Sequence, residues 1–233
     1  HYIVGFVVGR LCKLWFCFTK LVKVKFKAPL EWIERYKIRR GILKYNKLGG
    51  VVMELQGVHH VAYRCNDAKE TVEWYQKYLD MKFVLAIAEN EVPSTREPDP
   101  YMHVFLDAGG GNVLAFFELP TKEKMDRDRN TPTWVQHLAL KVGSINTLFE
   151  AKKRLEEGGH DVLGPVDHTI FQSIYFFDPN GHRIELTVNT STPEMERKLD
   201  AVKWDMLNEW SITRKASNHA QWMHDGSTHQ EVK

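Results

Sequence analysis

Glu185 lies inside an apolar stretch, RIELTV, where a charged side chain is unexpected. A strand of this kind faces a protein core, and a buried carboxylate is costly unless it is paired or binds a metal ion. The preceding residues add a histidine, His168, a tyrosine, Tyr175, and an Asp-Pro-Asn-Gly turn at positions 178–181. Imidazole, phenol and carboxylate groups at one site favour metal binding or acid–base catalysis.

Two more histidines occupy matching positions of an internal repeat. The stretch VHHVAYR at 58–64 aligns with VQHLALK at 135–141, and His60 and His137 are the third residue of each. Strand alternation places both on equivalent faces. Two imidazoles and one carboxylate form a ligand set with open positions, which suits iron(II) or manganese(II). The repeat therefore predicts a divalent-metal site made by His60, His137 and Glu185.

Three other residues are weaker candidates for this site. His59 points to the opposite strand face from His60, and His103 is expected to pack or to contact a substrate. Glu118 ends the last apolar strand of the first repeat. Counting from the glycine turns places Ala115, and not Glu118, at the position that Glu185 holds in the second repeat. The two positions point to opposite faces of a regular strand.

Each half of the repeat predicts one β-α-β-β-β module, over residues 55–119 and 133–190. The first helix follows Asn66 or Asp67 and the second follows Ser144, and all three side chains are good helix N-caps. Two such modules would form a curved mixed sheet around a shared cleft, in the α+β class.

A terminal helix is predicted over residues 193–215. Thr192 is its expected N-cap and Pro193 stands in its first turn, while one apolar stripe suits packing or a subunit contact. This helix and a polar tail make up residues 191–233, after a core domain at 53–190.

Charge divides the 233-residue chain unevenly. Residues 1–52 carry 12 basic and 2 acidic residues, a net of +10, and the rest carries 20 basic and 28 acidic residues, a net of −8. An acidic globular part argues against nucleic acid as its ligand. The three cysteines make no disulfide framework, which favours a reducing cytoplasm.

The first 52 residues are expected to lie outside the core. Arg10 and Lys13 interrupt their apolar runs, so neither run approaches the length of a membrane span, and a signal-peptide pattern is missing. A basic, aromatic segment can lie on an anionic membrane surface. We favour instead a non-native or upstream-translated extension, with Met53 as the natural start.

Paired β-α-β-β-β modules with first-strand histidines and a last-strand glutamate resemble the vicinal oxygen chelate superfamily. That superfamily includes glyoxalase I, type I extradiol dioxygenases, epimerases and drug-binding resistance proteins. The resemblance covers about residues 55–190. It implies a divalent metal ion that residues of both modules hold inside the cleft.

Residues 166–185 resemble the signature of type I extradiol dioxygenases more specifically. That signature has a His, an apolar residue with a Tyr, an Asp-Pro-x-Gly turn and a metal-binding Glu, matched here by His168, Tyr175 and Glu185. The resemblance implies iron(II) that binds a catechol and O2, His168 as the acid–base group and Tyr175 as a hydrogen-bond donor to the substrate. Manganese, nickel and zinc also suit such ligands.

Whether Glu118 of the first module is a metal ligand distinguishes two possible reactions. With Glu118 as a fourth ligand, the set would be that of bacterial glyoxalase I, an isomerase that acts on an α-oxo substrate. With Ala115 at the ligand position, the metal keeps room for a catecholate and O2. We therefore expect a dioxygenase with an aromatic diol and O2 as its small-molecule partners, ahead of the isomerase and of a non-catalytic binding protein. A homodimer is compatible with the sequence.

Overall fold

The computed structural model describes residues 55–223. The predicted extension at 1–52 and the last residues of the tail, 224–233, lie outside the described residues. Both modules and the terminal helix belong to one compact unit that begins at Gly57. Among residues 55–223, none of the helices combines the length and the apolar character that crossing a membrane requires.

The first module is a four-stranded sheet with one helix, in the order β1-β4-β3-β2. Its elements are β1 (Val61–Cys65), α3 (Ala68–Leu79), β2 (Lys82–Glu89), β3 (Tyr101–Asp107) and β4 (Val113–Glu118). Strand β1 pairs with β4 in parallel, and the other pairs are antiparallel.

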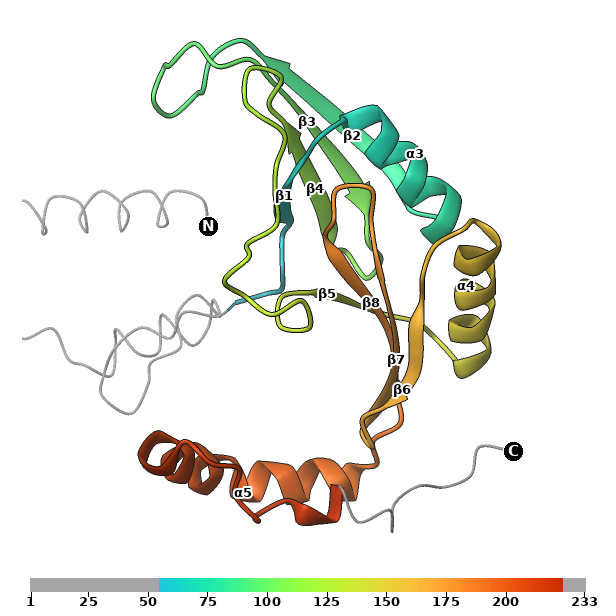
Figure 1. Ribbon diagram of the computed structural model, residues 1–233, viewed down its shortest axis with the longest axis vertical. Coiled ribbons are helices and arrows are strands. Elements are labelled where there is room, and N and C mark those ends of the chain that lie inside the picture. The colour runs from blue at the N-terminus through green and yellow to red at the C-terminus, as the bar shows by residue number, and fades with distance from the viewer. Residues whose placement is uncertain (1–54, 224–233) are drawn as a thin grey trace, which may run out of the picture. The chain divides into compact units, whose positions relative to one another are not determined.

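The second module repeats this plan, with the sheet order β5-β8-β7-β6 and a parallel pair of β5 with β8. Its elements are β5 (Leu138–Lys141), α4 (Ile145–Glu157), β6 (Leu163–Asp167), β7 (Phe171–Phe177) and β8 (Arg183–Asn189). The predicted α+β class with two β-α-β-β-β modules is confirmed. Figure 1 shows α3 and α4 side by side, each over the strands of its own module.

Both predicted histidine strands begin later than the sequence pattern indicated. Strand β1 starts at Val61 and β5 at Leu138, so that His60 and His137 each come directly before the first residue of a strand. The prediction that these histidines are strand residues is wrong by one position. Their equivalence is kept, because β1 and β5 hold the same place in the two sheets.

The helix caps follow the sequence prediction. The side chain of Asp67 accepts a hydrogen bond from the backbone N–H of Glu70, and Ser144 accepts one from Thr147. Each cap satisfies a backbone N–H that the helix itself leaves without a partner.

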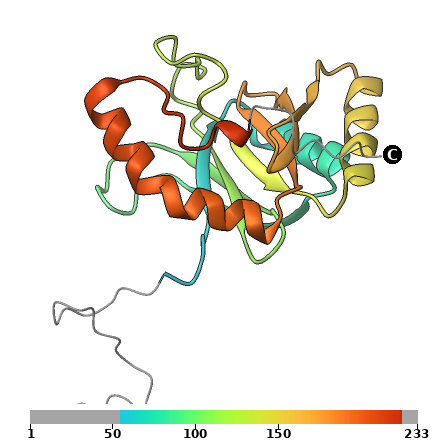
Figure 2. The same cartoon turned by 90° about the horizontal axis from the view of Figure 1, so that it is seen from below.

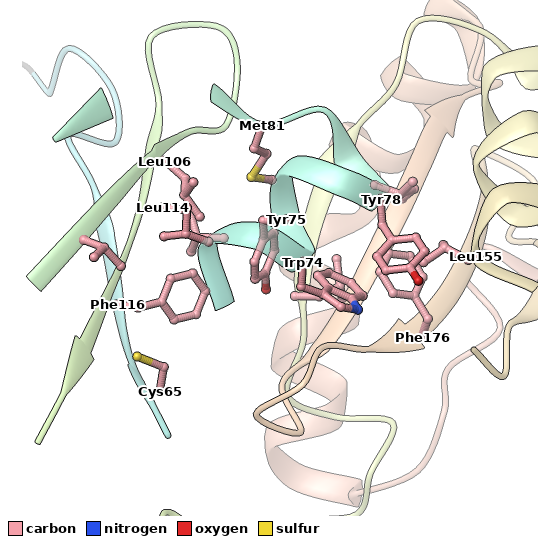
Figure 3. Packing of buried hydrophobic residues seen from close by; sticks show 14 of the residues in the cluster. Cys65, Trp74, Tyr75, Tyr78, Met81, Leu106, Leu114, Phe116, Leu155 and Phe176 are labelled. Carbon is pink, nitrogen blue, oxygen red and sulfur yellow. The ribbon is translucent and has the colours of Figure 1, made fainter. Parts of the chain in front are cut away.

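One hydrophobic core serves both modules. Figure 3 shows Trp74 and Tyr75 of α3 between Phe116 of the first sheet and Phe176 of the second. The ring centroids of Tyr75 and Phe116 are 5.2 Å apart, and those of Trp74 and Phe176 are 6.0 Å apart. The helix of the first module therefore packs on strands of both modules.

Hydrogen bonds join the same helix to the turn between β7 and β8. The Tyr75 hydroxyl donates to Oδ2 of Asp178 at 3.0 Å, and Nδ2 of Asn180 donates to the hydroxyl of Thr71 at 3.0 Å. The backbone N–H of Asn66 donates to Oδ1 of Asn180 at 2.8 Å. Burial, and then the Asp178 charge, raises the pKa of Tyr75 well above its ordinary value, so the phenol stays a donor.

Gly158 allows the two helices to approach closely. A Cβ atom added there would lie 2.4 Å from Cε1 of Tyr78, a buried ring that packs on Trp74 at 5.3 Å between centroids. We expect Gly158→Ala to lower the free energy of unfolding by about 1–3 kcal/mol, because the ring has to move within a packed core. Urea unfolding measures the change.

Gly143→Ala is the matched control, because a Cβ atom at Gly143 would meet nothing within 4 Å. It is expected to change the free energy of unfolding by about 0.5 kcal/mol or less. Equal effects of the two substitutions would contradict the close contact of Gly158 with Tyr78.

The terminal helix α5 spans Pro193–Thr213 and begins at the predicted N-cap, Thr192. The predicted stripe is half-buried, and it consists of Met195, Leu199, Val202 and Met206. Figures 1 and 2 show α5 apart from α3 and α4.

Part of the predicted polar tail packs against the second module. Ala220 is buried, and the carbonyl of Met223 accepts a hydrogen bond from the Thr169 hydroxyl at 2.7 Å. Residues up to 223 therefore pack beside the loop that carries His168.

Candidate metal and acid–base site

Glu185 is the centre of a buried polar cluster on the second sheet, with only 3% of its surface exposed. Its Oε2 lies 2.9 Å from Nε2 of His137. Its Oε1 accepts hydrogen bonds from the Tyr175 hydroxyl at 3.1 Å and from the Ser173 hydroxyl. These partners explain how an apolar strand tolerates a carboxylate.

His168 extends the cluster. Its Nε2 lies 2.9 Å from the Tyr175 hydroxyl oxygen. Burial, and then the Glu185 charge, raises the pKa of Tyr175 above its ordinary value, so the phenol is protonated at neutral pH. A phenol that donates to Glu185 accepts from His168, so this arrangement puts a proton on Nε2 of His168.

The strand register explains why these side chains meet. Glu185 of β8 stands opposite Tyr175 of β7 on one side. On its other side it stands beside Ala139 of β5. Their neighbours Ile174 and Ile184 point into the core, because successive strand residues face opposite sides. The cluster therefore lies on the open face of the second sheet, away from the core.

His60 lies in different surroundings, on the first sheet. Its Nδ1 is 2.8 Å from Nδ1 of His59, and its ring centroid is 6.5 Å from that of His103 and 6.2 Å from that of Phe105. Within residues 55–223, no three His, Cys, Asp or Glu side chains are grouped closely enough to hold a metal ion. The structure thus brings together four of the five predicted site residues, and the metal site that includes His60 stays a prediction.

The register also decides which residue of the first module corresponds to Glu185. Ala115 stands beside Ala62 of β1 as Glu185 stands beside Ala139 of β5. Glu118 points elsewhere, because its Oε2 accepts a hydrogen bond from the backbone N–H of Ala68 at 2.8 Å, at the start of α3. The equivalence of Ala115 with Glu185 is as the sequence predicted.

His103 packs against an aromatic side chain of the first sheet. It is 9% exposed and its ring stacks on Phe117 at 3.5 Å between centroids, while its Nε2 has no hydrogen-bond partner among the described residues. Burial, and to a lesser extent the nearby His60, lowers the pKa of His103.

Arg183 is a charged residue of the site that sequence reasoning missed. It stands on the same face of β8 as Glu185, two residues earlier, and its guanidinium carbon lies 4.2 Å from the centroid of the Tyr175 ring. A pocket of about 520 Å³ adjoins this point, and Arg183, His137 and Phe177 are among its walls. The sequence pattern that could have predicted Arg183 is the alternation of side chains along a strand, which places residues 183 and 185 on one face.

The family comparison covers both modules. The model described as the Glyoxalase/Bleomycin resistance protein/Dioxygenase superfamily matches residues 57–186.

Two curated relatives are similar to the chain. "Putative ring-cleaving dioxygenase MhqA" of Bacillus subtilis (strain 168) is 28% identical over 153 residues, which are 60% of this chain and 46% of the relative. "Biphenyl-2,3-diol 1,2-dioxygenase 3" of Rhodococcus globerulus is 26% identical over 141 residues, which are 58% of this chain and 65% of the relative. The chain thus spans less than two thirds of the length of either relative.

Among solved structures, a glyoxylase/bleomycin resistance protein/dioxygenase domain from Frankia sp. EAN1pec is 21% identical in sequence. It matches 58% of this chain and 99% of its own, with a TM-score of 0.47.

Proposed function

Because the chain belongs to the glyoxalase/bleomycin resistance protein/dioxygenase superfamily, we propose that it is a metal-dependent enzyme that cleaves the ring of a catechol with O2. The observation that carries the proposal is a continuous polar cluster. In it His168 is hydrogen-bonded to Tyr175, and Tyr175 is hydrogen-bonded to Glu185. Of the two relatives, the one at 28% identity is named as a ring-cleaving dioxygenase and the one at 26% as a dioxygenase of an aromatic diol, and both names support the proposal.

The donor atoms of the site fit a divalent cation. Glu185 and His137 offer a carboxylate oxygen and an imidazole nitrogen 2.9 Å apart, on a carboxylate that is almost wholly buried. A cation between them would neutralise that buried charge. When bound, iron(II) would supply two chemical functions, holding a catechol beside O2 and passing electrons between them. Manganese, nickel and zinc are compatible with the same donors.

We assign the third ligand to His60 of the partner subunit in a homodimer. The two sheets of one chain share their core through α3 and α4, and the open face of the first sheet carries the apolar side chains of Leu85 and Ile87 uncovered, at 45% and 41% exposure. A second copy of the chain that covers this apolar face would place the first sheet of one subunit against the open face of the second sheet of the other.

The chain's own residues have distinct tasks in this proposal. Tyr175 is a protonated phenol that donates to Glu185, and once a cation takes that carboxylate it is free to donate to a substrate oxygen. His168 lies 2.9 Å behind the Tyr175 hydroxyl and can deliver or accept a proton there. General acid–base groups of this kind contribute roughly 10²–10⁴-fold to a rate.

The glyoxalase-type alternative needs Glu118 as a further ligand. That carboxylate is engaged with the N–H of Ala68 at the start of α3, and Ala115 stands at the ligand position. This arrangement supports three protein ligands and open positions for two oxygen ligands of a catechol and O2. It favours the dioxygenase over the isomerase.

Anaerobic purification, metal analysis and an oxygen electrode test the proposed function. We expect about one iron per chain and O2 uptake in step with the loss of catechol, because both substrates share one cation. Uptake should stop when a chelator removes the metal and return when iron(II) is added. A protein that binds no metal, or whose iron-loaded form consumes no O2 with any catechol of a panel, would contradict the proposal.

A further inference from the structure

Arg183 lies beside the polar cluster, and among residues 55–223 this cation has no carboxylate partner. In that part of the chain its guanidinium makes two contacts, one over the Tyr175 ring at 4.2 Å and one from Nη1 to the carbonyl of Thr133 at 3.3 Å. Neither contact neutralises its charge. A guanidinium has five N–H donors, so most of them remain available to a ligand.

The pocket of about 520 Å³ gives a ligand access to this cation. Arg183 and His137 both line it, and Phe177 and Val135 add apolar walls. A substituent on an aromatic ring that binds beside His137 could therefore reach Arg183. The apolar walls would contact the faces of that ring.

The acidic residues of the pocket wall are bound to other groups. Asp126 accepts from Arg129 at 2.7 Å, and Asp128 accepts from the Thr131 hydroxyl at 2.5 Å. These contacts, with nearby Arg127 as a smaller contribution, lower the pKa of both aspartates, so they stay charged and engaged where they are. The charge of Arg183 is left for a ligand.

We propose that Arg183 binds a carboxylate substituent of the aromatic substrate, so that the substrates are acidic catechols. This inference rests on the proposed function and narrows its substrate class. A planar guanidinium pairs with a carboxylate through two parallel N–H···O bonds, and its contact with the Tyr175 ring holds it beside the polar cluster. A lysine would supply the charge without the pair of parallel N–H donors.

Anaerobic calorimetry on the iron-loaded protein tests the proposal without turnover. We expect 3,4-dihydroxyphenylacetate to bind about 10- to 100-fold more tightly than 4-methylcatechol, the range expected for hydrogen bonds to a charged group. Arg183→Gln should abolish this preference and leave the affinity for 4-methylcatechol within about 3-fold, because only the substituent contact is lost. Arg183→Lys should keep a part of it.

Arg127→Gln is the matched control, since Arg127 lines the same pocket and stands between Asp126 and Asp128. It should keep the preference. Equal binding of the two catechols by the unchanged protein, or a preference that survives Arg183→Gln, would overturn the assignment and leave the proposed function standing. Conversely, an Arg183-dependent preference in a protein that consumes no O2 would retain the carboxylate site and reject the dioxygenase.

Discussion

Replacing Glu185 with glutamine is expected to lower catechol-dependent O2 uptake by about 10³-fold or more, because the substitution removes the anionic ligand of the proposed metal site. The amide has the size of the carboxylate and can still accept from Tyr175 and Ser173, so the sheet should remain intact. Metal content per chain and the rate of O2 uptake, measured on the same preparation, report the effect.

Glu118→Gln is the matched control for this substitution. Glu118 ends the corresponding strand of the first module, where it accepts from the N–H of Ala68. Loss of its charge at the start of α3 should cost about 0.3–1 kcal/mol of stability and leave metal content and activity unchanged. A Glu185→Gln protein that keeps its metal and its activity would remove the basis of the proposed site.

Two inactive variants are expected to restore activity when they are combined in one dimer. We expect His60→Ala and Glu185→Gln to be inactive alone, since each removes a proposed metal ligand. In a mixed dimer, one site combines His60 of the partner subunit with an intact His137 and Glu185, and the other site carries both lesions. The mixed dimer should show about half of the unchanged dimer's activity, because one of its two sites is intact. Co-expression with two affinity tags isolates it.

A second pairing controls for this design. His137→Ala combined with Glu185→Gln should stay inactive, because both residues of each site come from one chain. If the His60→Ala and Glu185→Gln dimer forms but shows no activity, His60 acts within its own chain or has no role in metal binding. Metal analysis of His60→Ala alone separates these two results.

Local signals in the sequence predicted the modules well. Asp67 and Ser144 cap the two helices as their side-chain chemistry indicates, and the repeat in the sequence is a repeat in the sheets. The placement of His60 and His137 inside their strands was wrong by one position, because a strand also needs a partner. The paired ladder begins only where Val61 meets Leu114 and Leu138 meets Ile184.

The site was predictable within one sheet and not between sheets. Glu185, Tyr175 and His137 meet because strand alternation and a repeat fix their face and row. The placement of His60 relative to them depends on how one sheet is oriented toward the other, and that follows from the packing of α3 and α4. Nor does a sequence pattern show that Arg183 lies over a ring and not in solvent.

Tyr75 makes the two halves of the repeat depend on each other. The ring packs on Phe116 of its own module, and its hydroxyl depends on Asp178 of the other. A fragment with one half alone would lose the acceptor for that hydroxyl and part of the shared core. A change at Tyr75 therefore also affects the turn between β7 and β8, which leads into the strand that carries Glu185.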